Sequence, residues 1–262
     1  MAYGSAADAV DEYLRLGETT AISCLENFTE AMISLFGDEY LRRPTREDLQ
    51  RLLDMEESRG FPGMIGSIDC TLNDINVLDR SPVFDDILYG KAPKVRFSVN
   101  GHNYRLPYYL TDAIYPKWAT FVKSIPLPQS EKDTLFATWQ ESVRKDVERA
   151  FRVLQARFAI VKNPALMWDK EKIGKIMKAC IILRNMIVED ERPTNTQHNI
   201  SEFEQGEGSR TSHVDMGYST EMASNLDNLI GNRIQVRDTE IHDQLKEDLV
   251  EHIWHKFGGT AL

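Results

Sequence analysis

Three acidic residues have the types and positions that phosphodiester chemistry requires. Asp69 and Asp112 each end a short apolar segment, and Glu148 lies inside a long amphipathic segment. Carboxylates at the ends of neighbouring strands, joined by one from a packed helix, can hold two divalent cations about 3.5–4 Å apart, which activate water and stabilise the leaving oxygen. Hard oxygen ligands favour Mg²⁺ or Mn²⁺. Acids at strand ends are also common as the first residues of loops, so spacing alone leaves both interpretations open.

The segments that carry these acids have the patterns of two strands and one helix. The apolar run at 64–70 follows the breaker cluster Gly60-Phe-Pro-Gly63, and a second short strand is expected at 108–112. A helix of about 27 residues is expected from Ser130, where Ser130-Glu-Lys-Asp133 has the layout of a capping box. Its apolar stripe comprises Leu135, Trp139, Val143, Val147, Ala150, Phe151 and Leu154.

Other elements follow from periodicity, caps and turn residues. Asn100-Gly101 predicts a type I′ hairpin after a strand at 94–99, and Thr45-Arg-Glu-Asp48 predicts a helix start. Further helices are expected at 8–16, 20–36, 82–89, 170–188 and 239–257, with a last strand at 158–161. Because both helices and strands are expected, we predict a mixed α/β (α+β) fold.

Composition divides the chain into four regions. We expect an N-terminal helical region at 1–59, a central domain at 60–190, a disordered linker at 191–238 and a C-terminal helix at 239–262. The last helix has one apolar edge, Ile241, Leu245, Leu249 and Ile253, and we expect it to be poorly tied to the rest of the domain. Its histidines, at 242, 252 and 255, are interpreted as exposed residues rather than metal ligands.

Charge is distributed unevenly along the chain. The 262 residues include 31 Lys and Arg against 41 Asp and Glu, a net of −10, which argues against a polyanionic partner. Residues 141–184, however, hold 11 basic and 5 acidic residues, a net of +6. Nucleic acid therefore remains open as a partner of this segment, with an ordinary solvated helix surface as the alternative.

The cysteines and the lengths of the apolar runs indicate in which compartment the protein acts. Its three cysteines, Cys24, Cys70 and Cys180, have no CxxC spacing, which predicts neither a disulfide framework nor a thiolate metal site. No apolar run approaches the length of a membrane span, and residues 1–11 lack a signal-peptide pattern. We expect an intracellular, soluble protein that is not secreted.

Four segments carry a resemblance to a known family. Residues 60–70, 72–84, 109–116 and 147–158 look like the PIF/Harbinger transposase-derived nucleases of the plant lineage, and 178–187 is similar to the closing helix of that family. The resemblance covers roughly residues 40–190. It implies an RNase H-like core, here with an incomplete central sheet, and a DDE triad in which Asp69, Asp112 and Glu148 bind two Mg²⁺ or Mn²⁺ ions and drive DNA cleavage.

The resemblance also implies partners and a location. Family members act on DNA in the nucleus, with the cytoplasm as the alternative, and are associated with a separate Myb-like protein. DNA contacts are expected from basic residues around Glu148, namely Arg144, Lys145, Arg149, Arg152 and Arg157. Asp74 is a candidate accessory acid. The overall acidity predicts that DNA binding is weak and salt-sensitive.

The chain departs from the family pattern in ways that bear on activity. A segment of a few dozen residues that family members carry after the first aspartate is missing, because Cys70 runs directly into Thr71. Arg152 and Arg184 stand where the family has Gly and His. Two hypotheses remain: a metal-dependent DNA nuclease, or a catalytically inactive, domesticated or decayed relative that acts only through protein or DNA binding.

Overall fold

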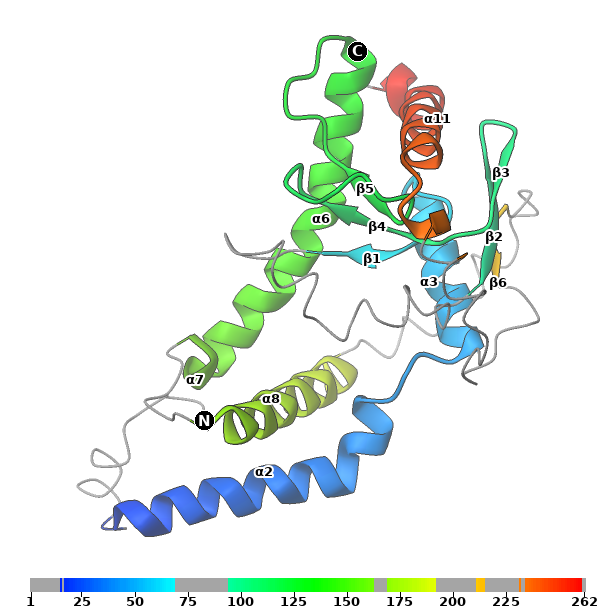
Figure 1. Cartoon of the computed structure of the whole chain (residues 1–262). Helices are drawn as coiled ribbons and strands as arrows, with labels where there is room; N and C mark the ends of the chain where they lie inside the picture. Colours follow the sequence, from blue (N-terminus) through cyan, green and yellow to red (C-terminus); the bar gives the residue numbers. More distant parts are fainter. Residues whose placement is uncertain are drawn as a thin grey trace. The chain divides into compact units, whose positions relative to one another are not determined.

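The computed structural model describes residues 15, 17–68, 94–162, 169–191, 211–214, 231 and 234–260. It contains both helices and small sheets, which confirms the predicted α+β class (Figure 1). The chain forms two compact units, one from Met1–Arg43 and Arg149–Glu207, the other from Pro44–Glu148 and Gly208–Leu262. The boundary between them falls inside the long helix α6 (Glu131–Arg157).

In the first unit, α2 (Glu18–Tyr40) and α8 (Lys170–Asp190) lie side by side (Figure 1). They pack through the buried side chains of Met32, Ala179 and Ile182. These helices confirm those predicted at 20–36 and 170–188. Both extend beyond the prediction because their last turns are also tied together, by a 2.6 Å hydrogen bond from the Tyr40 hydroxyl to Glu189 Oε2.

The predicted strand at 158–161 is wrong, because these residues form α7 (Ala159–Lys162). The backbone N–H of Phe158 donates to the carbonyl of Leu154 at 2.9 Å, which continues the helical turn at the end of α6. Leu154 and Phe158 are buried in one cluster with Ile176 of α8. Packing onto that helix thus outweighs the strand propensity of Ile160 and Val161.

The second unit contains a three-stranded parallel sheet. Its strands are β1 (Met64–Ser67), β4 (Tyr108–Thr111) and β5 (Phe121–Lys123), in the order β1-β4-β5. Tyr108, Leu110, Phe121 and Met64 are almost completely buried. The two predicted strands that precede Asp69 and Asp112 are therefore confirmed as neighbours.

A second small sheet combines β2 (Val95–Val99), β3 (His102–Tyr104) and β6 (His213–Val214). Asn100 has φ 51° and Gly101 has φ 87°, the two positive angles that the predicted type I′ turn requires. Strand β6 lies inside the segment predicted to be a disordered linker, and it pairs antiparallel with β2. For residues 211–214 the expected disorder is therefore wrong.

Glu57 of α3 (Arg46–Ser58) holds the segment that contains β6. Its carboxylate accepts hydrogen bonds from Thr211 N at 2.9 Å, Thr211 Oγ1 at 2.7 Å and Ser212 N at 3.1 Å. Burial raises the pKa of Glu57, but the hydrogen bonds from Ser212 and Thr211 outweigh it and leave the pKa below its ordinary value. These contacts join residues more than 150 positions apart in sequence, so local composition did not indicate them.

Two predicted caps define the starts of α3 and α6. Thr45 Oγ1 accepts from Asp48 N at 3.2 Å while Asp48 Oδ2 accepts from Thr45 N at 2.9 Å, which completes the capping box of α3. Ser130 Oγ accepts from Asp133 N at 3.1 Å at the start of α6. Most of the predicted apolar stripe of α6 is at least partly buried, but Phe151 is 48% exposed.

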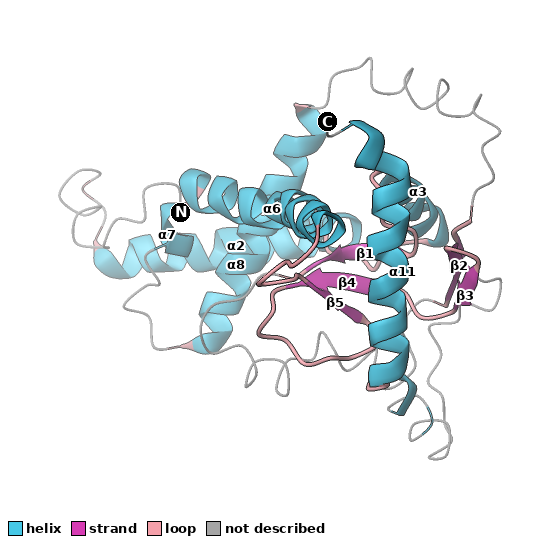
Figure 2. Cartoon of the chain, turned by 90° about the horizontal axis from the view of Figure 1, so that it is seen from above, coloured by secondary structure: helices cyan, strands magenta, loops and turns pink. Residues whose placement is uncertain are grey.

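The C-terminal helix α11 (Thr239–Phe257) belongs to the core of the second unit and is followed by the short 3₁₀ helix η1 (Gly258–Thr260). Leu245, Leu249 and Ile253 are at most 1% exposed and pack in one cluster with strands β2 and β4 and with α6. Figure 2 looks down on the sheet β1-β4-β5 with α11 and α6 in front of it. The expectation that this helix is poorly tied is therefore wrong.

The helices predicted at 8–16 and 82–89 lie outside the described residues, apart from Arg15. Within the described part of the chain, none of the helices combines the length and the apolar character that crossing a membrane requires.

Candidate functional site

The three predicted acids are described to different extents. Asp112 directly follows β4, and Glu148 lies in α6. Asp69 lies just outside the described residues, which end at Ile68 on this segment. Strands β1 and β4 run parallel, with Ser67 paired to Leu110, and Ile68 N donates to Leu110 O at 2.9 Å. The carboxyl ends of both strands therefore meet at the same edge of the sheet.

One face of α6 is anchored at that edge. Gln140 is completely buried, and its Nε2 donates to the carbonyls of Thr111 at 3.1 Å and Val122 at 3.4 Å, which belong to β4 and β5. Arg144 and Glu148 stand four and eight residues after Gln140, and this spacing puts all three on one side of the helix. The anchor thus directs Arg144 and Glu148 toward the end of β4.

Arg144 brings the two described acids together. Its Nη2 lies 3.0 Å from Asp112 Oδ1 and 3.3 Å from Glu148 Oε1. The side chain of Arg144 is 11% exposed, against 33% for Asp112 and 24% for Glu148. Two carboxylates that are 36 positions apart in the sequence therefore face the same cationic nitrogen in a partly buried setting.

Contacts at the other side of α6 hold the helix against α3. Arg59 Nη2 pairs with Asp146 Oδ2 at 2.6 Å, and Arg59 Nη1 pairs with Glu56 Oε1 at 3.3 Å. Burial raises the pKa of Glu56, and the nearby guanidinium of Arg59 partly offsets this. The indole of Trp139 donates to the carbonyl of Arg59 at 2.8 Å and stacks on Phe257, so Trp139 is a packing residue.

Oxygen donors for a cation are present at the edge of the sheet. No three His, Cys, Asp or Glu side chains converge as a metal site among the described residues, a set that omits Asp69. Asp112 and Glu148 supply two carboxylates that already face one positive charge, and carboxylate oxygens are the ligands that Mg²⁺ and Mn²⁺ prefer. The donor set therefore fits a hard divalent cation.

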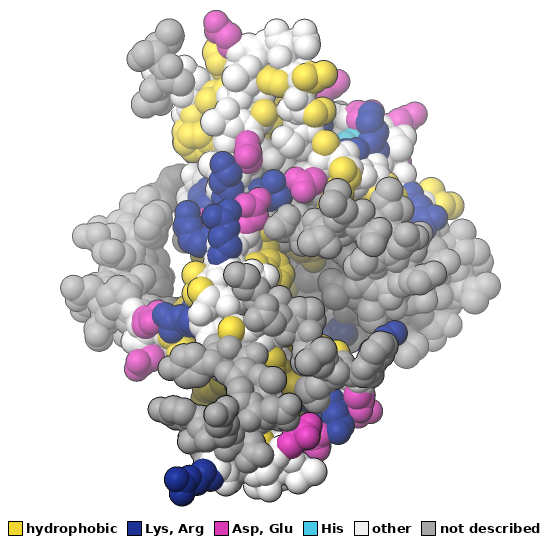
Figure 3. All heavy atoms as spheres, turned by 90° about the vertical axis from the view of Figure 1, so that its left-hand side faces the viewer, with side chains coloured by type: hydrophobic (Ala, Val, Ile, Leu, Met, Phe, Trp, Pro, Cys, Tyr) yellow, Lys and Arg dark blue, Asp and Glu magenta, His cyan; other side chains and the backbone are white. Residues whose placement is uncertain are grey.

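The predicted DNA-contacting residues differ in exposure. Lys145, Arg149 and Arg152 are exposed on α6, with Lys145 3.4 Å from Glu141. Arg157 is 36% exposed and pairs with Glu191 at 2.6 Å. Arg144 is mostly buried against the acids and so differs from the other four. Figure 3 shows Lys and Arg side chains gathered on one face of the molecule, with Asp and Glu side chains between them.

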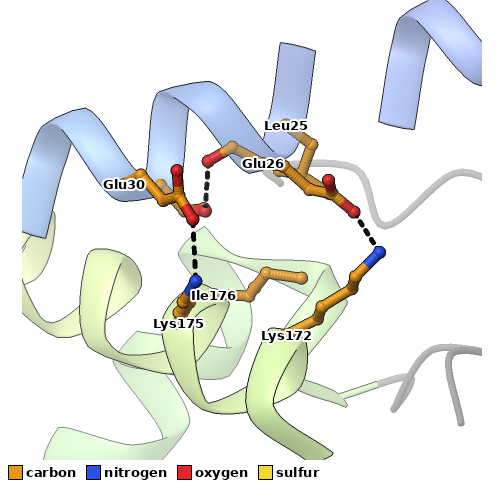
Figure 4. A pocket seen from close by; sticks show the side chains of 7 residues that line it. Leu25, Glu26, Glu30, Lys172, Lys175 and Ile176 are labelled. Atoms are coloured by element: carbon orange, nitrogen blue, oxygen red, sulfur yellow. Dashed lines mark hydrogen bonds and ion pairs between the residues drawn. The ribbon is translucent and has the colours of Figure 1, made fainter. Parts of the chain in front are cut away.

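A small pocket in the first unit has a lining that includes neither Asp112 nor Glu148. It lies between α2 and α8 and is lined mainly by Leu25, Glu26, Glu30, Lys172, Lys175 and Ile176 (Figure 4). Its lysines pair with its glutamates, Lys175 with Glu30 at 2.7 Å and Lys172 with Glu26. Because its lysines and glutamates pair with one another across the pocket, we interpret it as part of the packing between α2 and α8.

Two residues of the site have roles that the sequence did not indicate. Gln140 was not predicted, although a glutamine next to the apolar stripe of a helix is a signal for a buried hydrogen bond. Arg144 was predicted as a DNA contact, whereas its four-residue spacing before Glu148 is that of a helical ion pair. Asp74, the candidate accessory acid, lies outside the described residues.

Comparison with known proteins places the chain in a family. The family model described as plant transposon protein matches residues 38–72 and 71–195. The two matched stretches overlap at residues 71–72, next to the Cys70–Thr71 junction. No curated protein and no solved structure matches the chain significantly. Since the family match covers more than half of the 262 residues, this chain belongs to the plant transposon protein family.

Proposed function

We propose that the protein is a divalent-metal-dependent DNA endonuclease of the PIF/Harbinger type, with an RNase H-like core and the triad Asp69, Asp112 and Glu148. The observation that carries this proposal is the convergence of Asp112 and Glu148 on one nitrogen of Arg144. The two acids come from a strand end and a helix, the arrangement that a phosphodiester-cleaving metal site requires.

The register of the sheet supports Asp69 as the third acid. Ser67 of β1 pairs with Leu110 of β4, and each aspartate stands two positions further along its own segment. Parallel strands end at the same edge, so equivalent positions after paired residues are suited to a shared site. The order β1-β4-β5, with α6 anchored on the ends of β4 and β5, likewise supports an RNase H-like core.

Asp69, Asp112 and Glu148 would hold Mg²⁺ or Mn²⁺. When bound, such ions activate a water molecule and stabilise the leaving oxygen of the DNA strand. The residues of this chain supply the negative oxygens, and α6 orients Glu148 through the Gln140 anchor. Asp74 remains the candidate for an accessory acid in this site.

DNA is the proposed substrate, and the nucleus is the proposed location. The exposed Lys145, Arg149 and Arg152 lie on the same helix as Glu148, so phosphates bound by them would lie near the acids. The net charge of −10 favours help from a basic partner, and we propose a Myb-like protein for this role.

An inactive, domesticated or decayed protein that acts only by binding DNA or protein is the second candidate. One observation favours it: the family match falls into two stretches that meet after Cys70, where the sequence lacks a segment present in the resembling nucleases. A displaced ligand can reduce the rate of a metal site about 10²-fold, so the loss of scaffold beside Asp69 bears directly on catalysis.

Nicking of supercoiled plasmid DNA in Mn²⁺ tests the proposal. We expect nicking by the purified protein that is reduced about 10²-fold or more in Asp112→Asn and in Glu148→Gln, because each change removes a charged metal ligand. Glu141→Gln is the matched control, since Glu141 lies on the same helix but is 55% exposed and pairs with Lys145.

Three outcomes separate the candidates. If Glu141→Gln retains nicking while Asp112→Asn and Glu148→Gln lose it, the result supports the nuclease. Nicking that survives in Asp112→Asn would assign the activity to another site or to a contaminant. A folded protein that binds DNA but nicks none in Mg²⁺ or Mn²⁺ would instead support the inactive relative.

A further inference from the structure

We infer that Arg144 is a positioning residue, an internal counter-ion that holds the Asp112 and Glu148 carboxylates together without metal and has to leave them before a divalent cation binds. The inference rests on the proposed function, because it concerns the same acids. It assigns Arg144 a role distinct from the DNA contact predicted for it.

The geometry of the contact is the first step. A single nitrogen, Nη2, faces Asp112 Oδ1 at 3.0 Å and Glu148 Oε1 at 3.3 Å. The pair with Glu148 alone would be an ordinary i,i+4 contact on a helix, which stabilises by only a few tenths of a kcal/mol. The contact with Asp112 is different, because it joins α6 to the residue that follows β4.

Because Arg144 is largely buried, its guanidinium interacts with the two carboxylates more strongly than it would in an exposed ion pair. Arg144 is 11% exposed, so solvent screens its charge less than that of an exposed side chain. Two carboxylates directed at the same point repel each other, and repulsion between them grows as water is excluded. A cation between them therefore offsets this repulsion and holds Asp112 and Glu148 close together in the absence of metal.

The same position excludes a metal ion from these two oxygens. Mg²⁺ needs its oxygen ligands at about 2.1 Å. Asp112 Oδ1 and Glu148 Oε1 are each already within 3.3 Å of a positively charged nitrogen, so an ion bound by both would meet steric overlap and like-charge repulsion from Arg144. Metal affinity should then depend on how readily the long arginine side chain rotates away.

Mn²⁺ binding to the full-length protein, followed by the EPR signal of the free ion, tests the exchange directly. In Arg144→Gln we expect the Mn²⁺ dissociation constant to fall about tenfold, because a competing charge is removed. The Mn²⁺ dissociation constant of Arg144→Lys should lie between those of the wild type and Arg144→Gln, since lysine keeps a charge but lacks the planar guanidinium. Lys145→Gln is the matched control for metal affinity, because it removes one charge from the neighbouring residue, whose contact is with Glu141.

Thermal unfolding in EDTA tests the counter-ion role without metal. Arg144→Gln should unfold at a lower temperature than the wild type, and the double change Arg144→Gln with Glu148→Gln should recover part of the loss because it removes the repulsion. If Arg144→Gln alone folds poorly, metal binding is compared between the wild type and Arg144→Lys instead.

The outcomes distinguish the inference from the function on which it rests. Unchanged or weaker Mn²⁺ binding in folded Arg144→Gln or Arg144→Lys, while Asp112→Asn abolishes binding, would overturn the inference and leave the metal site intact. No recovery in the double variant would also overturn it. Mn²⁺ binding that is insensitive to both Asp112→Asn and Glu148→Gln would instead overturn the proposed metal site, and the exchange at Arg144 with it.

Discussion

At the residue scale, two glycines with positive φ illustrate how the backbone near the site is constrained. Gly63, directly before β1, has φ 80°, and a Cβ there would lie 2.4 Å from the buried ring of Phe97. Gly101, at the hairpin tip, has φ 87° and open space around it. Both tolerate a conformation that L-residues avoid, but only Gly63 also permits close approach of a ring to the strand that leads to Asp69.

Gly63→Ala should therefore destabilise the protein more than Gly101→Ala. The left-handed conformation costs alanine about 1 kcal/mol or more at either position. The overlap with Phe97 adds about 1–3 kcal/mol at Gly63 because the ring lies in the core. Urea unfolding of the two variants measures the difference, and equal losses would show that Phe97 moves aside freely.

At the element scale, α11 contributes three buried side chains, Leu245, Leu249 and Ile253, to the core of the second unit. Its His242 is 2% exposed, and Nδ1 lies 3.0 Å from the carbonyl of Trp118. Burial lowers the pKa of His242, although the hydrogen bond to Trp118 opposes this, and burial together with Lys256 lowers the pKa of His252. Of the histidines interpreted as exposed, His242 is therefore buried and His252 partly buried, because the helix packs on the sheet.

The docking of α11 should weaken in mild acid. A histidine with a depressed pKa in the folded state is protonated more readily in the unfolded chain, so stability is full above the ordinary value of about 6.5 and is lost as pH falls below it. For each such group the free energy of unfolding decreases by up to about 1.4 kcal/mol per pH unit. Unfolding measured between pH 7.5 and 5.5 should show this decrease.

Variants on the same helix identify the group responsible. His242→Gln should reduce the slope of stability against pH, whereas His255→Gln, at an exposed position, should leave it unchanged. A wild-type stability that stays constant or rises toward pH 5.5 would contradict the assignment. Because His252 remains in both variants, part of the slope should persist in His242→Gln.

At the scale of the whole molecule, ion pairing reduces the basic character that the sequence indicates. Of the 11 cations in residues 141–184, several face acids: Arg144 contacts Asp112 and Glu148, Lys175 contacts Glu30, and Arg157 contacts Glu191. The charge of +6 therefore overstates what this segment presents to a phosphate backbone. Lys145, Arg149 and Arg152 are exposed on α6, the helix that carries Glu148, and on this ground they stay the proposed DNA contacts.

Salt dependence of DNA binding tests that assignment. The triple change Lys145→Gln, Arg149→Gln and Arg152→Gln should weaken binding and reduce the slope of log affinity against log salt by about 2–3, because each phosphate contact contributes about 0.9. Fluorescence anisotropy with a labelled duplex measures both quantities. A control that changes Arg51, Lys117 and Lys132 to glutamine removes equal charge from residues that lie outside the basic segment 141–184. An equal loss of DNA affinity in the two triple variants would mean that net charge alone governs binding.

Features that depend on residues close in sequence were predictable for this protein. The capping box of Thr45 and Asp48, the turn at Asn100-Gly101 and the start of α6 at Ser130 all involve contacts within a few positions. The strands that precede Asp69 and Asp112 followed from short apolar runs, and the resemblance identified the acids. The family match now supports the transposon-derived origin of the chain, while cleavage remains a proposal.

Only the tertiary structure decided which distant segments meet. The helix at 159–162, the pairing of His213–Val214 with β2, the burial of α11 and the contact of Arg144 with Asp112 each depend on a partner outside the local segment. Local propensity carries no information about such partners, because the free energy comes from apolar area and charges that distant residues provide. The sequence alone therefore determined the elements that depend on local patterns and the candidate acids, and the packing of β4, α6 and α11 determined how Asp112 and Glu148 come to face one cation.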